Sequence, residues 1–593
     1  MILRHLTCLL VLLLCACAPG EPATEFATPD FATVAFVGSA ACTDCHEDRH
    51  ESWARTFHRT MTQTATDQSV QGAFDGQVVQ MNGGSVRPLK NADGYFFEYL
   101  DPSTGKTLGR IQVERTVGSN RYQQYLGKVP SGGDNHYRLE MLWHNQERRW
   151  VPMSGAFFSP DGERFDAHFT TWEQNCIFCH NTGPEPRVQN FDALRARAAR
   201  GEAVNFPDET RFAAHVAELG IGCESCHGPG AAHLAANAGW LRRTQLKISG
   251  ASDPTIINPA NLESARAADV CGACHAQRQP KTLALVDTWL STGPTYRPGA
   301  KLSDHVTPVS IDTPGPAFDP DLFKLRFWGD GSPRLSAYEY QGFNQSQCHL
   351  GQEKMSCITC HSMHDGDPRG MQTPEQRSDA PCARCHQKIA GEVVEHSGHD
   401  AGSDGARCVS CHMPKMVYGV MEIHRSHRIE KPDPAAAVSF DRPDACSACH
   451  LDWSSAQIVA KMSKSADPGP GLPRHLELLF GGDPIARAVA ANQPRSVAKD
   501  LSEAQIRAAL SALNVSLSDP YLAVRRFAWR SMQALNSELN PAPIEPEKLA
   551  RFDWIQAAQP SPFALPPPDI EPGVLTELHA RANAKTRQIS IGE

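Results

Sequence analysis

A short pattern, in which two cysteines are separated by two residues and followed at once by a histidine, recurs eight times in the chain. Two cysteines at this spacing can form thioethers with the two vinyl groups of one haem, and the adjacent histidine can then ligate the iron. The pattern therefore predicts eight covalently attached haems of the c type. The eight copies are Cys42-Cys45-His46, Cys176-Cys179-His180, Cys223-Cys226-His227, Cys271-Cys274-His275, Cys357-Cys360-His361, Cys382-Cys385-His386, Cys408-Cys411-His412 and Cys446-Cys449-His450.

Two other uses of these cysteines were weighed against haem attachment. A disulfide framework is plausible in an exported protein, but it does not explain why a histidine follows every cysteine pair. A zinc site needs paired cysteine motifs or histidines at helical spacing, and it also ignores the repeated histidine. Both alternatives are much weaker than the haem interpretation.

The spacing of the motifs indicates how the haems are used. Five of the seven intervals between successive motif starts are only 25 to 48 residues long. Segments of that length are too short to form a domain with its own apolar core. We therefore expect the haems to supply most of the interior and to pack against one another, which would make a conduit for electrons.

The second axial ligand of each iron has to come from elsewhere in the chain. Fourteen further histidines lie within the region from His50 to His427. Ligation of iron by two histidines favours low reduction potentials, whereas a methionine ligand raises them. The candidates for the second position are His58, His168, His233, His349, His364, His396, His399 and His427.

The first 17 residues carry an export signal. Arg4 precedes an apolar run from Leu6 to Leu14, which is too short to span a bilayer but fits a secretory leader. A buried core helix is the alternative. The residues around Cys17 resemble a bacterial lipobox, and Ala18 resembles the class sent to the outer membrane. We expect a periplasmic lipoprotein that is anchored at Cys17, with residues 18–37 as a flexible tether.

The net charge of the chain argues against one class of binding partner, the nucleic acids. The 593 residues include 57 Lys plus Arg and 66 Asp plus Glu, which give a net charge of −9. A nucleic-acid binder needs a basic face for phosphates, so we expect no nucleic-acid partner. The 44 Gly and 44 Pro predict many turns and loops between the regular elements.

The elements that position the motifs divide into three parts. Residues 38–175 hold the first motif and a small β insertion, in which Tyr95, Phe97 and Tyr99 alternate with polar neighbours. Residues 176–453 hold the other seven motifs. Residues 454–593 are helical and end in a Pro-rich linker and a final segment. We expect a fold that is mainly α with abundant loop.

The C-terminal part contains clear helix signals. Ser502 and Gln505 form a capping-box pattern ahead of an apolar stripe. Asp483-Pro484 and Asp519-Pro520, 36 residues apart, predict two further helix starts. That interval is close to the period of HEAT-like or TPR-like helical repeats, and an ordinary helical hairpin is the alternative.

These residues carry a family resemblance. The segments GSAACTDCHEDRHESWARTFH (38–58), HFTTWEQNCIFCHNTG (168–183), GIGCESCHGPGAAH (220–233) and DACSACHLD (444–452) resemble bacterial multihaem cytochromes c with cytochrome c-552/4-type domains and C-terminal helices. The chain resembles octahaem hydroxylamine oxidoreductase-like cytochromes more distantly. It has no CxxCK motif, the variant in which lysine replaces the motif histidine. The resemblance implies an exported electron-transfer protein built around stacked, mostly bis-histidine haems.

Three functions are compatible with these features. The first is an electron carrier that exchanges electrons with donor and acceptor cytochromes or a membrane complex. The second is an octahaem reductase or oxidase of a small nitrogen or sulfur compound at one haem with an open coordination position, where Tyr122, Tyr125, Lys128 and Arg138 are candidate proton donors. The third is a scaffold whose C-terminal helices dock a partner complex. The electron carrier is the leading hypothesis.

Overall fold

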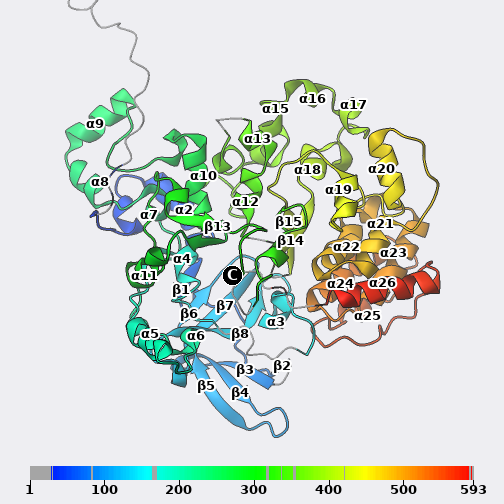
Figure 1. Ribbon diagram of the computed structural model, residues 1–593, viewed down its shortest axis with the longest axis horizontal. Coiled ribbons are helices and arrows are strands. Elements are labelled where there is room, and N and C mark those ends of the chain that lie inside the picture. The colour runs from blue at the N-terminus through cyan, green and yellow to red at the C-terminus, as the bar shows by residue number, and fades with distance from the viewer. Residues whose placement is uncertain are drawn as a thin grey trace, which may run out of the picture.

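The computed structural model describes residues 29, 31, 33–81, 84–162, 170–315, 319–335, 337–351, 355–419, 421–586 and 589. The predicted leader with Cys17, most of the predicted tether, and His168 lie outside the described residues. Two sheets lie at one end of the molecule, short motif-bearing helices arch over them, and longer C-terminal helices pack at the side (Figure 1).

The fold is mixed α/β, which corrects the expectation of a mainly α protein. Helices make up 39% of the structure and strands 16%. The predicted β insertion exists, but it is not small, because strands run from Thr62 to Pro152. Sequence alternation underestimates the insertion because the inner strand β8 (His136–His144) is buried at every position and so lacks the two-residue period of a half-buried strand.

The insertion forms two antiparallel sheets. In the first, β8 is an inner strand and pairs with the preceding strand through Tyr122 opposite His144 and Lys128 opposite His136. The five-stranded sheet has the order β1 (Thr62–Thr64), β6 (Arg115–Val117), β7 (Tyr122–Lys128), β8 and β9 (Arg149–Pro152). The four-stranded sheet has the order β2 (Val79–Met81), β3 (Gly84–Asn91), β4 (Gly94–Leu100) and β5 (Thr107–Gln112).

An aromatic cluster joins the two sheets. Phe97 of β4 packs against Tyr125 of β7 and Trp150 of β9, with ring centroids 5.7 and 5.4 Å apart. The Tyr125 hydroxyl accepts a hydrogen bond from the Gly72 N–H, and a Cβ at Gly72 would lie only 2.5 Å from that oxygen. This apolar core holds the sheets together without any help from the motif-bearing segments.

The motif-bearing region consists of short helices, loops and three hairpins. Its hairpins are β10 (Asn181–Glu185) with β11 (His215–Leu219), β12 (Arg278–Pro280) with β13 (Val306–Pro308), and β14 (Lys415–Gly419) with β15 (Glu422–Arg425). Its helices, together with those just before it, are α2 (Glu47–Ala54), α3 (Met153–Ala156), α4 (Ile177–His180), α5 (Phe191–Ala199), α6 (Phe206–Glu209), α7 (Glu224–His227), α8 (Ala231–Ala236), α9 (Trp240–Ser249), α10 (Ser264–Gly272), α11 (Leu283–Thr292), α12 (Glu339–Asn344), α13 (Gln347–Leu350), α14 (Pro374–Arg377), α15 (Ala380–Ala383), α16 (Gln387–Gly391), α17 (Val393–Ser397), α18 (Cys408–His412) and α19 (Pro434–Ser439).

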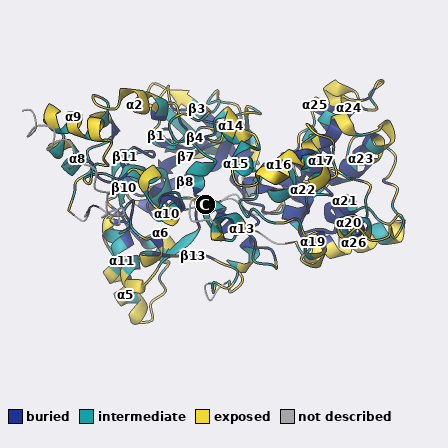
Figure 2. Cartoon of the chain, turned by 90° about the horizontal axis from the view of Figure 1, so that it is seen from above, coloured by how far each residue is buried: buried dark blue, intermediate teal, exposed yellow. Residues whose placement is uncertain are grey.

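The C-terminal helices form the largest apolar core of the described residues (Figure 2). The helix over Ser502–Gln505 is confirmed with its capping box, and Asp483 caps the preceding helix through the N–H groups of Ile485 and Ala486. The helix predicted from Asp519-Pro520 begins slightly later, at Leu522. The helices are α20 (Ser455–Ser463), α21 (Arg474–Gly481), α22 (Pro484–Val497), α23 (Glu503–Ser516), α24 (Leu522–Asn536), α25 (Pro546–Ala550) and α26 (Pro572–Ala584).

A buried arginine joins these helices to the rest of the molecule. Arg526 of α24 is fully buried and donates to Glu147, Glu422 and the Nε2 of His144 at 2.7, 3.1 and 2.9 Å. Those partners come from the turn after β8, from β15 and from the end of β8. Within the described part of the chain, no helix combines the length and the apolar content needed to cross a bilayer.

Candidate haem-binding site

The eight motifs share a local backbone geometry. In seven of them the histidine N–H donates to the carbonyl of the first cysteine at 2.8–3.1 Å, which closes one helical turn. The eighth, Cys408 to His412, is a helix of its own, α18. Residues three and four positions apart lie on the same face of a helix. Both thiols and the imidazole of each motif therefore face the same side, as attachment to one flat ring requires.

The motifs line a common cavity of 3290 Å³. All three side chains of the first seven motifs and Cys446 of the eighth border it. A site for one small molecule usually measures about 300–1,000 Å³. The cavity is therefore large enough for several bulky groups in contact with one another. Among the motif cysteines, only Cys176 is buried by protein atoms, as expected for thiols that face such a cavity.

Six motif histidines face a second histidine from another part of the chain. The centroids of the paired rings are 6.0–6.3 Å apart. Two imidazoles that bind one metal ion from opposite sides, each at about 2 Å, have centroids roughly 6 Å apart. The six pairs are His46 with His233, His275 with His58, His227 with His364, His361 with His427, His412 with His396, and His450 with His399.

Hydrogen bonds at Nδ1 orient several of these rings. The Nδ1 of His227 donates to the Ile257 carbonyl at 2.7 Å, and the Nδ1 atoms of His361 and His412 donate to backbone carbonyls at 2.8 Å. Because a carbonyl oxygen only accepts, the proton must be on Nδ1. Nε2 then has a lone pair available for a metal, which is the usual second-sphere arrangement of a ligating histidine.

Burial keeps most of the paired histidines neutral. Burial, with a smaller contribution from the nearby His275, lowers the pKa of His58 to about 4. It also lowers the pKa values of other motif and facing histidines, and a metal ligand must be deprotonated at the nitrogen that binds. The histidines with lowered pKa values are His46, His180, His227, His361, His364, His427 and His450.

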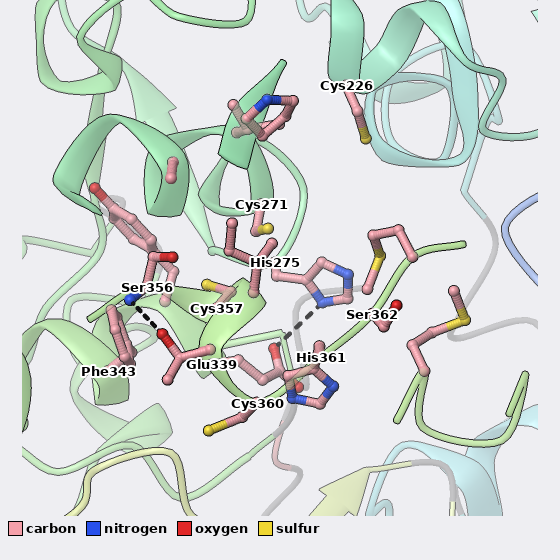
Figure 3. A pocket seen from close by; sticks show the side chains of 18 of the residues that line it. Cys226, Cys271, His275, Glu339, Phe343, Ser356, Cys357, Cys360, His361 and Ser362 are labelled. Carbon is pink, nitrogen blue, oxygen red and sulfur yellow. Dashed lines mark hydrogen bonds and ion pairs between the residues drawn. The ribbon is translucent and has the colours of Figure 1, made fainter. Parts of the chain in front are cut away.

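His275 has a carboxylate neighbour that outweighs the effect of burial on its pKa. Burial lowers the pKa of His275, but the carboxylate of Glu339, 3.8 Å from Nδ1, outweighs this and raises it to about 9. Figure 3 shows Glu339 and His275 facing each other within the cavity. A carboxylate at Nδ1 holds the proton there and makes Nε2 a stronger donor to a metal.

The donor groups fit haem better than a bare metal ion. No group of three or more His, Cys, Asp or Glu side chains in the described residues is arranged to hold a metal ion. At six of the motifs two imidazoles instead face each other across a gap, with two thiols beside one of them. A ring that supplies four nitrogen ligands would complete such a site, and the two thiols would hold that ring.

Thiols of different motifs lie next to one another, which indicates which motifs are neighbours. Cys42 and Cys223 are within hydrogen-bonding contact, as are Cys179 and Cys274, Cys271 and Cys357, and Cys382 and Cys408. Charge interactions connect Cys226 with Cys271, Cys360 with Cys382, and Cys411 with Cys446. Figure 3 shows Cys271 and Cys357 in the same part of the cavity, with Cys226 above them.

When the motifs are numbered along the chain, these contacts place them in one row. The order is 1, 3, 4, 5, 6, 7, 8, and motif 2 branches from motif 4 through Cys179 and Cys274. The spatial order therefore differs from the sequence order only at the second motif.

Two predicted ligands are not placed opposite a motif histidine. His168 lies outside the described residues. His349 donates from Nδ1 to the Met355 carbonyl at 3.2 Å, and its ring lies 4.4 Å from that of Phe343. Conversely, the described residues contain no imidazole ring stacked across from His180 or His386 at the separation found for the six pairs.

The candidate proton donors separate into two groups. Tyr122 and Arg138 line the cavity. Tyr125 belongs to the aromatic cluster between the sheets, and Lys128 is paired with Asp134 at the surface. Burial of Tyr125 raises its phenol pKa far above the usual value, which makes it a poor proton donor.

Sequence reasoning missed several residues that support the site. Besides Glu339, Asp253 approaches the Nδ1 of His233 at 3.2 Å, and the Trp453 ring stacks on His450 at 3.7 Å. Trp453 lies three residues after His450, so the sequence offered a weak indication that the two rings could meet. No sequence pattern indicated the contact of Asp253 with His233, because it depends on a loop that returns to α8.

Comparisons with known proteins yield no family assignment. No family model matches the chain, and no curated protein does. Among solved structures, the chain is similar to an outer cell wall cytochrome, OcwA, with a TM-score of 0.47 and 18% identity over 93% of this chain and 100% of that chain. A similarity of that size does not define a family, so the function has to follow from the residues of the chain itself.

Proposed function

We propose that the protein is an exported multihaem cytochrome c that carries electrons along eight covalently attached haems. The main support is the set of six imidazole pairs at 6.0–6.3 Å, each of which includes one motif histidine. Haem supplies the one-electron chemistry when bound. The sixteen motif cysteines hold the rings, and the histidines on both sides keep the irons at low potential.

The contacts between thiols support a branched relay. Motifs 1 and 8 are at the ends of the row, and the fourth motif connects the third, fifth and second. The links from motif 1 to 3, 4 to 5, 6 to 7 and 4 to 2 are thiol contacts, and the other three are charge interactions between thiols; we propose that rings linked in either way exchange electrons directly. The proposed route therefore runs from the first motif to the eighth, and the second haem is reached through the fourth.

The number of haems and their reduction behaviour test this proposal. The holoprotein should contain eight haems per chain by pyridine haemochrome assay and by intact mass. A potentiometric titration should show at least the six haems with paired imidazoles reduced at low potential, as bis-histidine ligation requires. Fewer than eight haems in the pure protein, or high potentials throughout, would contradict the relay.

The surroundings of His180 support a second candidate function. Tyr122 and Arg138 line the cavity, and the charge of Arg138 acts on the Cys176 thiol of the same motif. A small nitrogen or sulfur oxyanion could be bound there by the guanidinium and protonated by the phenol. Electron paramagnetic resonance distinguishes the two functions. A high-spin signal that shifts with nitrite or hydroxylamine supports the enzyme, and exclusively low-spin iron excludes it.

The anchor is a separate part of the proposal. We place the acyl chains on Cys17 because the lipobox-like leader supports lipid attachment. The replacement Cys17→Ser should transfer the protein from the membrane fraction to the soluble fraction. Retention of this variant in washed membranes would remove the lipobox argument.

A further inference from the structure

Helix α9 exposes large apolar side chains at the edge of the molecule. Trp240, Leu241 and Ile248 are 65%, 67% and 82% exposed, and none of the ten residues of α9 is buried. Figure 2 shows the helix as an exposed element at the far end of the chain from the C-terminal helices. Single exposed apolar residues are common, but three on one short helix form a patch.

The helix is amphipathic, and its inner side is already occupied. Arg242 pairs with Asp253 at 3.0 Å, and Leu246 lines the cavity. At 100° per residue, Trp240, Leu241 and Ile248 share the opposite face. Arg243 and Lys247 border that face, and the helix contains no acidic residue. A short helix with Trp, Leu and Ile on one face and flanking basic residues is typical of a membrane interface.

The path of the N-terminal residues places the proposed anchor near α9. Phe31 lies against Gly228, and the Ala35 carbonyl accepts a hydrogen bond from the Ala231 N–H at the start of α8. Only Asn237, Ala238 and Gly239 separate α8 from α9. Twelve residues from Cys17 to Pro29 span at most about 40 Å. A lipid on Cys17 would therefore hold this end of the molecule close to the bilayer.

We propose that α9 lies in the head-group region of the membrane that holds the anchor. The side chains of Trp240, Leu241 and Ile248 insert at the boundary between the lipid head groups and the acyl chains. Lys247, which lies next to Trp240 on the helix surface, contacts lipid phosphates. This inference rests on the proposed export and lipid attachment, and it adds an orientation that a tether alone does not give.

The orientation places the start of the haem row at the membrane. The Nη1 of Arg243 lies 3.6 Å from the Sγ of Cys45, in the first motif. Both Arg243 and Lys247 also line the cavity. The same helix thus covers the first haem position on one side and meets lipid on the other, so electrons would pass between the first haem and a membrane-bound donor or acceptor.

Vesicle flotation tests this orientation without the acyl chains. The Cys17→Ser holoprotein is produced with a leader that is cleaved off during export, so that the purified protein carries no acyl chain. It is then mixed with vesicles of phosphatidylethanolamine and phosphatidylglycerol in a 3:1 ratio. We expect it to float with the vesicles, and the variant with Trp240→Ser and Ile248→Ser to lose at least about tenfold in the bound fraction. The variant Lys247→Gln should bind these anionic vesicles less tightly and change little on phosphatidylcholine.

A matched control removes equally exposed apolar residues elsewhere. Leu108 of β5 and Leu283 of α11 are 69% and 85% exposed, so the variant with Leu108→Ser and Leu283→Ser should float like the parent protein. Equal binding by the α9 variant and the parent would overturn the proposal, and so would a parent that does not bind vesicles. If light scattering showed the parent protein to be a dimer and the α9 variant to be a monomer, the membrane proposal would be overturned, because a second copy of the chain would then cover this face.

The outcome can be separated from that of the proposed function. Haem content and spin state are measured on the same samples, and they report on the relay whether or not the vesicles bind. Loss of vesicle binding with eight low-spin haems contradicts the membrane orientation alone. A low haem count in a protein that still floats contradicts the relay alone.

Discussion

The pair formed by His58 and His275 provides the sharpest test of the ligand assignment. The planes of its two rings are 84° apart, whereas the planes of the other five pairs differ by 11–34°. Crossed ligand planes leave the two dπ orbitals of ferric iron nearly equal in energy, and parallel planes split them. The fourth haem should therefore give a strongly anisotropic low-spin signal in electron paramagnetic resonance, distinct from the rhombic signals of the parallel pairs.

Replacing His58 by Ala should abolish that signal. One motif of eight loses its facing imidazole, so roughly one eighth of the ferric iron should change from low to high spin. Cys271 and Cys274 still hold the ring, so the haem count should stay at eight. The measurement is spin quantification at low temperature, with the total iron determined on the same sample.

A second ligand variant serves as the matched control. His364→Ala removes the partner of His227, whose ring planes are 29° apart. It should convert the same fraction of iron to high spin, but at the expense of a rhombic signal and not of the anisotropic one. Persistence of the anisotropic signal in His58→Ala, or its loss in His364→Ala, would refute the pairing.

Three further predictions concern the contacts that hold the molecule together. Arg526→Met removes a buried cation from the half-buried Glu147 carboxylate and leaves the half-buried Glu422 with Arg530 and His144 as its nearest basic partners, so it should cost about 3 kcal/mol in urea unfolding, whereas Arg507→Met at an exposed pair should cost at most about 0.5 kcal/mol. Burial raises the pKa of Glu422, but His144 and Arg526 outweigh it and lower the pKa to about 2. Because this folded-state pKa lies below the usual value of about 4.3, the ionised Glu422 stabilises the fold above pH 4.3, and this stabilisation is lost as the pH falls towards 2. The melting temperature of the parent protein should therefore drop more steeply over this pH range than that of the Glu422→Gln variant. Ser502→Ala removes the capping box of α23 and should lower stability by about 1 kcal/mol in calorimetry, and an unchanged melting temperature would show that the cap contributes nothing.

Local sequence patterns predicted the local elements well. The capping box at Ser502, the cap at Asp483 and the alternation of Tyr95, Phe97 and Tyr99 each depend on neighbours within a few residues, and the helices and strand that they predict are present. The β8 strand was missed because it is buried on both faces, which removes the alternation that identifies a strand. Its burial comes partly from β9 and α3, which follow it closely, and partly from the four-stranded sheet and the C-terminal helices, which are distant in sequence.

The sequence by itself determined the chemistry of this protein, and the tertiary structure decided its connections. A covalent attachment motif is local, because two thiols and an imidazole within one helical turn suffice, so eight haem positions could be predicted without a fold. The facing histidine is not local. His58 follows the first motif but faces the fourth, His233 follows the third but faces the first, and His364 follows the fifth but faces the third. Only chain folding brings such residues together, and the same folding places the motifs in a branched row.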